Sequence, residues 1–245
     1  MIWAILSLAL GGVLKGATGA GVPVVAVPAL AMVYSVDFAV TTLIMSNLVN
    51  NLWQGWAYRR DALPRRFVWH FAGGGMLGAG AGTWLLANLP GAALSLTVAV
   101  AVYLYIGFRL LRPDWAVPLA TGRRLAAPVG VAGGLMQGAA GISAPVSITF
   151  LNALSLSRGC FMGTISVFFV AMTVVQIPAL IMVGLLDWER FWISCGALVI
   201  ASAFMPAGSW LGARISKRVF DRVVLVLLGL IATRIIVMAL WSGAG

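Results

Sequence analysis

The chain has few of the side chains on which catalysis and metal binding depend. Among its 245 residues there are six Asp and Glu, one His and two Cys. No carboxylate pair, Ser/His/Asp set or cluster of metal ligands lies in its apolar segments, so the sequence predicts neither an enzyme nor a bound metal or cofactor. Cys160 and Cys195 lie in apolar segments without a CxxC spacing. This indicates packing rather than a disulfide or a metal site.

Charge of either sign is scarce. Charged residues make up 9% of the chain, against about 25% in a soluble domain. Apolar residues make up 62%, and the mean hydropathy is +1.03. These values predict an integral, multi-pass protein of the cell inner membrane. The net charge of +10 could favour nucleic acid, but in a membrane protein basic residues report orientation. We therefore expect the lipid bilayer, and no nucleic acid, as the surroundings.

Two glycine-rich stretches with the same pattern interrupt the apolar sequence. They are Gly16-Ala-Thr-Gly-Ala-Gly-Val-Pro23 and Gly138-Ala-Ala-Gly-Ile-Ser-Ala-Pro145, offset by 122 residues. The flanking apolar runs are 2–14, 24–34, 125–136 and 146–156. Each run is shorter than the roughly 20 residues that cross a bilayer core. Each unit is therefore predicted to be two half-helices that meet near the midplane, and broken helices in matching positions indicate a transporter's substrate site.

The rest of the chain repeats the same order of elements. The remaining predicted spans are 36–58, 67–87, 92–108, 159–186, 191–213 and 223–240. The polar link between the halves predicts a first membrane repeat at 1–112 and a second at 123–245. The linker is 113–122, and both repeats form a single transmembrane domain.

The basic residues bear on whether the second broken unit crosses the membrane or turns back. If it turns back, thirteen basic residues lie on one side and Arg190 alone lies on the other, which the positive-inside rule strongly favours. For the first unit we rely on the repeat. The predicted fold is an all-α integral membrane protein with two inverted repeats. Each repeat consists of one re-entrant broken-helix hairpin and three transmembrane helices.

With these two stretches and this layout, the chain resembles the sulfite exporter TauE/SafE-like family, also called TSUP. The resemblance rests on 16–23 with Pro28 and on 138–145, and it covers nearly the whole chain. The family is linked to export of sulfite and organosulfonates and to uptake of related anions. The resemblance therefore implies a small anionic substrate.

The breaks themselves suggest how an anion could be bound. Pro23 and Pro145 suit the first turn of a helix, which would leave the amides of Gly19–Gly21 and Gly141–Ser143 free at helix N-termini that attract anions. The alternative is that the glycines only permit close packing. The predicted substrate-binding residues are Lys15, Thr18, Gly19, Ala20, Gly21, Val22, Asn47, Asn51, Gln54, Gln137, Gly141, Ile142, Ser143, Ala144 and Gln176.

Several of these residues are predicted because they are polar and lie within apolar segments. Lys15 near the midplane needs a partner, either the substrate or a structural group, and its counterpart in the second copy is the neutral Gln137. Asn47, Asn51 and Gln54, together with Asn50, lie at i, i+4, i+7 and i+3 and share one helix face. That face either lines the path or joins helices.

The sequence favours a secondary transporter or facilitator of small sulfur oxyanions, exporting them by alternating access at a midplane site between the two breaks. One alternative is an anion uptake permease of the same family. Others are a channel-like pore and a membrane enzyme or assembly factor. Whether the chain is a monomer or a homodimer stays open.

Overall fold

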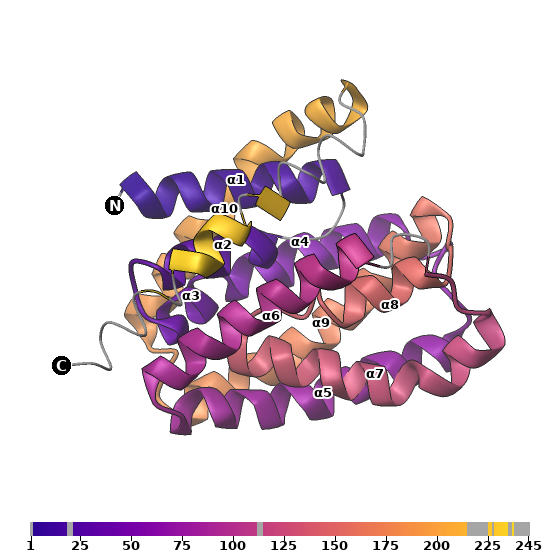
Figure 1. The fold of residues 1–245 in the computed structure, drawn as a ribbon, viewed down its shortest axis with the longest axis horizontal. Helices are drawn as coiled ribbons and strands as arrows, with labels where there is room; N and C mark the ends of the chain where they lie inside the picture. The colour runs from indigo at the N-terminus through magenta and orange to yellow at the C-terminus, as the bar shows by residue number, and fades with distance from the viewer. Residues whose placement is uncertain are drawn as a thin grey trace.

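The computed structural model describes residues 2–18, 22–111, 115–214, 225–226, 228–234 and 237, and these contain helices and no strand (Figure 1). The helices are α1 (Ile2–Thr18), α2 (Val22–Ala31), α3 (Val36–Thr42), α4 (Ile44–Ala57), α5 (Arg65–Asn88), α6 (Gly91–Leu111), α7 (Leu119–Ala140), α8 (Ser147–Ala153), α9 (Arg158–Met182) and α10 (Trp188–Arg214). The predicted all-α class is therefore confirmed. Of the span predicted at 223–240, the structure describes residues 225–226, 228–234 and 237, which are helical. The remaining residues of this span lie outside the described part of the chain.

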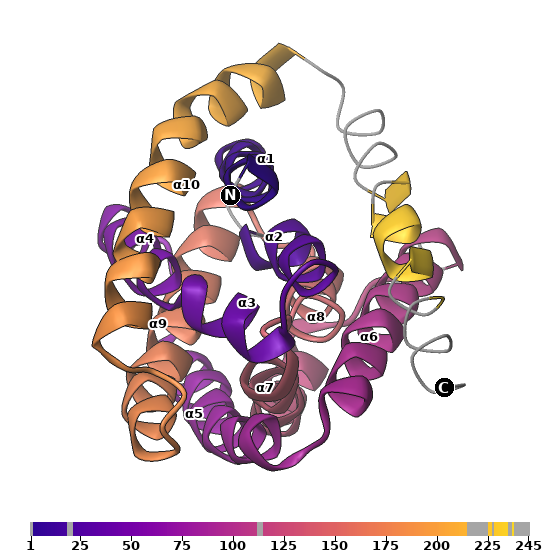
Figure 2. The ribbon, with the colours of Figure 1, turned by 90° about the vertical axis from the view of Figure 1, so that its left-hand side faces the viewer.

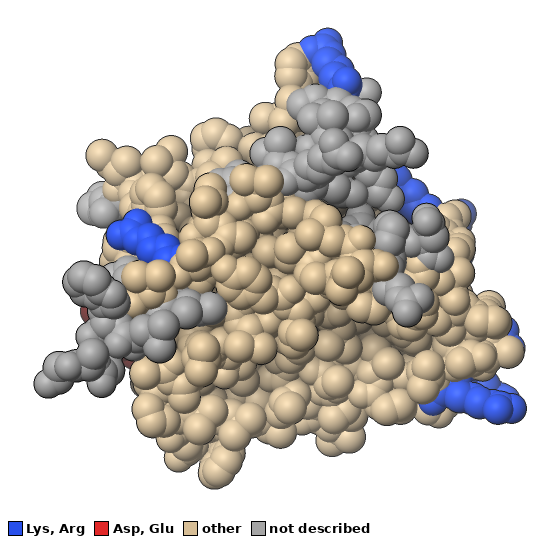
Figure 3. Space-filling view, in the orientation of Figure 1, with Lys and Arg blue, Asp and Glu red and all other residues tan. Residues whose placement is uncertain are grey.

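Within the described residues, three helices contain a stretch long and apolar enough to cross a membrane. These stretches are Gly91–Phe108 in α6, Arg158–Met182 in α9 and Trp188–Leu211 in α10. The face drawn in Figure 3 carries no described charge over its middle, and its Lys and Arg side chains lie toward the edges. Large apolar side chains such as Leu77 and Trp84 are exposed, as expected for a surface that contacts lipid. These features support a multi-pass membrane protein.

The first broken unit is a helical hairpin. The indole Nε1 of Trp3, near the start of α1, donates a hydrogen bond of 3.1 Å to the carbonyl of Ala29, near the end of α2. Further along α1, the position of a Cβ on Gly11 lies 3.0 Å from the carbonyl oxygen of Val22. Because early residues of α1 meet late residues of α2, the second helix runs back along the first.

The second broken unit turns back in the same way. The amide of Val117, just before α7, donates to the carbonyl of Ala153 at the end of α8, at 2.7 Å. Deeper in the hairpin, a Cβ on Gly133 would lie 3.4 Å from the Cβ of Ser147. Both units are therefore antiparallel hairpins whose tips contain the glycine-rich stretches.

The second tip differs from the prediction in two respects. Pro23 does lie in the first turn of α2, but Pro145 precedes α8, which begins at Ser147 and has seven residues. The cause is the backbone of Gly141, which ends α7 in the left-handed region at φ 69°. The chain then needs a turn through Val146 before the carbonyl of Ser143 can accept the amide of Ser147 and start the next helix.

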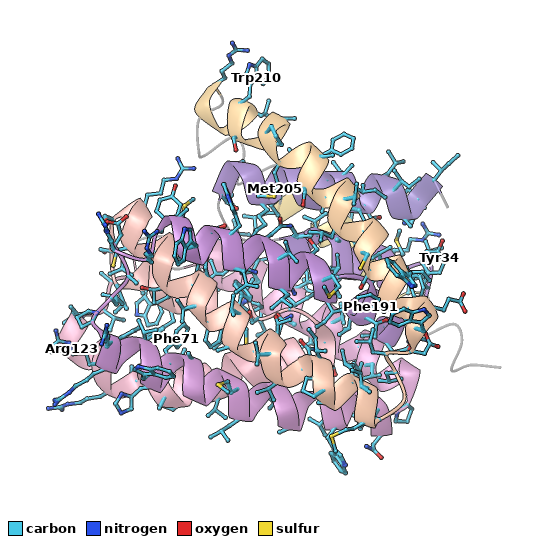
Figure 4. The ribbon with its side chains drawn as sticks, turned by 180° about the vertical axis from the view of Figure 1, so that it is seen from behind. Tyr34, Phe71, Arg123, Phe191, Met205 and Trp210 are labelled. Atoms are coloured by element: carbon cyan, nitrogen blue, oxygen red, sulfur yellow. The ribbon has the colours of Figure 1, made fainter. Side chains whose placement is uncertain are left out.

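Glycine rows bring two pairs of helices into backbone contact. On α5 and α7, a Cβ on Gly78 would lie 2.1 Å from the carbonyl oxygen of Val131, and one on Gly138 would lie 2.4 Å from that of Ala79. The same crossing recurs between α1 and α10, where a Cβ on Gly16 would lie 2.0 Å from the carbonyl oxygen of Met205. Small residues at every fourth position permit such close approach in membranes. Figure 4 labels Met205 on α10 where that helix crosses α1.

The central pair is α4 and α9, which run antiparallel. Gly163 on α9 lies against the carbonyl of Tyr58 just after α4, and Ser166 one turn later lies against Gly55. The predicted span 36–58 is divided at Leu43, which separates α3 from α4. Viewed end-on, α2 and α8 lie inside the molecule, with α4 and α9 on one side and α6 on the other (Figure 2). The short helices α2 and α8 are thus enclosed by longer helices.

Candidate functional site

A buried lysine connects the first hairpin to the central pair. Lys15 lies in the last turn of α1 with 4% of its surface exposed. Its Nζ donates a hydrogen bond of 2.9 Å to Oδ1 of Asn51 on α4. The Asn51 amide is oriented by its own Nδ2, which donates to the carbonyl of Asn47 at 2.7 Å. Lys15 is therefore held by a neutral oxygen, and this contact leaves its positive charge uncompensated.

The polar face predicted on α4 is buried as a whole. Asn47, Asn50, Asn51 and Gln54 are all within 7% exposure, beside Ser46. Their spacing therefore indicated the buried side of the helix correctly. The hydrogen bonds of Asn50 show that this face joins helices at one position.

Asn50 joins helices. Its Nδ2 donates to Oγ of Ser46 at 3.2 Å, and its Oδ1 accepts a hydrogen bond of 3.1 Å from Oγ of Ser202 on α10. Ser202 was not among the predicted residues, and its place in an apolar helix gave no signal of its own. Asn47, by contrast, has no side-chain hydrogen-bond partner among the described residues, so its amide is available to a ligand.

The second hairpin carries a related pair of residues. Gln176 on α9 donates from Nε2 to the backbone carbonyl of Gln137 on α7, at 3.4 Å. The same carbonyl accepts the amide of Gly141 at 2.9 Å. The Gln176 side chain therefore lies at the end of α7, where the glycine break begins. At the 122-residue offset Gln137 corresponds to Lys15 and Gln176 to Gln54, so α7 meets α9 as α1 meets α4, although the counterpart of Asn51 is Thr173.

Both glutamines have buried oxygens that lack a partner in the described part of the chain. These atoms are Oε1 of Gln137, which is 3% exposed, and Oε1 of Gln176, which is fully buried. The amide of Gln176 cannot be turned around, because only its nitrogen can donate to the Gln137 carbonyl. Ser166 Oγ and Thr42 Oγ1 are likewise buried without a described partner. Ser166 lies nearly three turns before Gln176 on α9, and its isolated hydroxyl gave no signal in the sequence.

The backbone after α7 corrects one prediction and leaves another in place. The amide of Gly141 is not free, because it donates to Gln137, and no helix begins within three residues of it. The amides of Ile142, Ser143 and Ala144 have no hydrogen-bond partner among the described residues, although each residue is 2% exposed. A buried amide without a partner is costly, so these three are donors available to a bound group.

The other predicted residues are distributed as follows. Thr18 Oγ1 donates to the carbonyl of Leu14 in its own helix at 2.8 Å, and Val22 is buried at the start of α2. Gln54 is buried and has an interaction partner. Gly19, Ala20 and Gly21 lie outside the described residues.

The structure thus brings Lys15 to Asn51, and Gln137 to Gln176. It also places three unpaired amides just beyond Gln137, at the tip of the second hairpin. Such a set can bind a small group by one positive charge, side-chain amides and backbone N–H donors. Among the described residues no group of three or more His, Cys, Asp or Glu could hold a metal ion.

A family model described as Sulfite exporter TauE/SafE matches residues 4–235 of the chain. No curated protein and no solved structure matches it. The matched range includes every candidate site residue named above and all of both hairpins except the first two residues of α1.

Proposed function

Because the chain belongs to the Sulfite exporter TauE/SafE family, we propose that it carries a small sulfur oxyanion, sulfite or an organosulfonate, out of the cell. The family is one of membrane transporters of the sulfite-exporter type, so the chain is a multi-pass membrane transporter. The observation that supports an anionic substrate is the burial of Lys15 against a neutral partner. A charge inside a membrane segment marks a substrate pathway by default.

The polar groups around the hairpin tips suit a sulfonate or sulfite. Its oxygens accept hydrogen bonds from several directions. We expect Lys15, Asn47 and the backbone amides of Ile142–Ala144 to donate them. An interior-negative potential favours exit of an anion by about 2.3 kcal/mol per charge per 100 mV, so export needs no intramembrane carboxylate for proton coupling.

The way in which the two halves exchange packing partners supports alternating access. The hairpin helix α1 of the first half packs on α10 of the second, and α7 of the second packs on α5 of the first, both through glycine contacts. This exchange supports two inverted repeats, at 1–112 and 123–245, joined by 113–122. In such transporters one repeat rocks against the other around a fixed midplane site.

The inverted-repeat arrangement also predicts how the protein is oriented in the membrane. Arg123 lies at one end of the molecule, and Tyr34 and Phe191 lie at the other (Figure 4). We expect the Arg123 end to face the cytoplasm and the Arg190 end to face outward. An impermeant thiol reagent should label Trp188→Cys, but not Arg123→Cys, in intact cells of a strain that expresses these variants on a background without Cys160 and Cys195. The opposite labelling would contradict the orientation.

The test of function is flux through the purified chain in liposomes. We expect saturable sulfite or organosulfonate flux that accelerates when the same anion is present on the other side of the membrane. Flux without saturation or counterflow would indicate a pore, and no flux of any anion would indicate the enzyme or assembly-factor alternative. An accumulation assay in cells would distinguish export from uptake.

A further inference from the structure

The described part of the interior has a single buried charged side chain. Of the charged side chains that the structure describes, Lys15 is the only one in the buried class. Arg190 is partly exposed and paired with Asp37 at 2.9 Å near the ends of their helices, and the described Arg234 is exposed. No other described cation or carboxylate therefore lies beside Lys15 to change the local charge balance.

The corresponding place in the second half is neutral. Lys15 corresponds to Gln137 at the 122-residue offset, and the two unpartnered atoms there, Oε1 of Gln137 and Oε1 of Gln176, are hydrogen-bond acceptors. An oxygen of this kind attracts an O–H or N–H group and repels a second negative charge. The first hairpin thus carries one buried cation, and the second carries buried acceptor oxygens.

We propose that this site selects monovalent over divalent anions. The inference rests on the function proposed above and specifies the charge of its substrate. A monoanion beside Lys15 forms a neutral pair, whereas a dianion leaves one uncompensated negative charge in a medium of low dielectric constant. Such a charge costs several kcal/mol after relaxation. The site therefore accepts hydrogensulfite or a sulfonate and rejects sulfate.

The direct test compares methanesulfonate with sulfate. Both present tetrahedral sulfur and several acceptor oxygens, but their charges are −1 and −2. With the purified full-length chain in detergent, we expect methanesulfonate to raise the unfolding temperature with an apparent Kd at least roughly tenfold below that of sulfate. Liposome flux of the two anions should show the same preference.

A second positive charge in the site should allow sulfate to bind. Gln137→Lys places a charge at the position equivalent to Lys15, so this variant should gain sulfate binding. The matched control is Gln137→Met, which removes the amide without adding charge and should gain none. Failure of a folded Gln137→Lys to gain sulfate binding would overturn the role of this position in charge selection.

The outcomes separate this inference from the proposed function. If the parent chain binds and transports sulfate as well as methanesulfonate, charge selection is wrong while anion transport stands. If neither of these anions nor sulfite gives stabilisation or flux, the proposed function itself fails. If Gln137→Lys does not fold, the ratio of the apparent Kd values of sulfate and methanesulfonate on the parent chain still decides whether the site selects by charge.

Discussion

The two hairpins share a backbone plan and differ in their polar groups. In each, a long helix turns at a glycine-rich stretch and is crossed by a helix from the other half of the chain. The first hairpin presents the ammonium of Lys15 to Asn51. The second presents the carbonyl of Gln137 to Gln176 and leaves two side-chain oxygens without a described partner.

This difference shows which features the repeat preserves. Close helix crossings depend on the absence of side chains, and glycines at Gly12 and Gly16 recur as Gly134 and Gly138. At the end of the first helix of each hairpin the two copies differ by one unit of charge, because Gln137 takes the place of Lys15.

The largest expected effect comes from removing the charge of the first hairpin. Lys15→Gln should weaken anion binding by roughly 10- to 150-fold, because a charge-assisted hydrogen bond contributes about 1.5–3 kcal/mol. Lys15→Arg should keep part of the binding. Titration of the unfolding temperature with methanesulfonate measures both. Unchanged affinity in a folded Lys15→Gln would mean that the lysine serves to hold α1 against α4.

Adding a methyl group at the helix crossings should destabilise both halves in the same way. Gly16→Ala places a methyl group 2.0 Å from a neighbouring backbone oxygen, and Gly138→Ala places one at 2.4 Å. In both variants the crossing helices must therefore separate. We expect each to lower the free energy of unfolding by about 1–3 kcal/mol, measured as a lower unfolding temperature without ligand.

The control for these variants is Gly73→Ala. A Cβ on Gly73 meets nothing within 4 Å, so this substitution should leave the unfolding temperature unchanged or slightly raised. Gly75 is unsuitable as a control, because its Cβ would lie 2.5 Å from the ring of Phe168. If Gly16→Ala were as stable as Gly73→Ala, the crossing of α1 and α10 would be looser than described.

The partner residues on α4 and α9 should behave differently. Asn51→Ala removes the acceptor of a buried ammonium and should cost about 1–3 kcal/mol of stability. Gln176→Leu removes an amide whose oxygen has no described partner, so its effect on stability should be near zero. Thermal unfolding of both variants without ligand tests this. A large loss in Gln176→Leu would show that its bond to the Gln137 carbonyl holds the second hairpin in place.

The smallest effect concerns the ion pair between the halves. Asp37 and Arg190 approach to 2.9 Å, with side chains that are 25% and 29% exposed. At the 122-residue offset Asp37 corresponds to Gly159, so the second copy has no equivalent carboxylate. Asp37→Asn should cost roughly 0.2–1 kcal/mol, and the difference from the parent should shrink as salt is raised. A cost independent of salt would indicate that the hydrogen bond rather than the charge matters.

Several features could be predicted from the sequence because they depend on composition and spacing. The scarcity of charge indicated a membrane protein, and the two glycine stretches located both hairpin tips. The i, i+3, i+4, i+7 spacing on α4 marked its buried face, since helical periodicity alone decides which residues share a side. The need of Lys15 for a partner also followed from the cost of a bare charge in a membrane.

Other features were decided by contacts between distant segments. Pro145 was expected inside a helix, but the left-handed Gly141 ends α7 and leaves Pro145 in a turn. Gly75 lies against Phe168 of α9, which its place in a glycine-rich span does not predict. Local spacing does not contain such neighbours, because they depend on how α5, α7 and α9 cross. The choice of Asn51 as the partner of Lys15, and of Ser202 as the partner of Asn50, likewise exists only where α1, α4 and α10 meet in three dimensions.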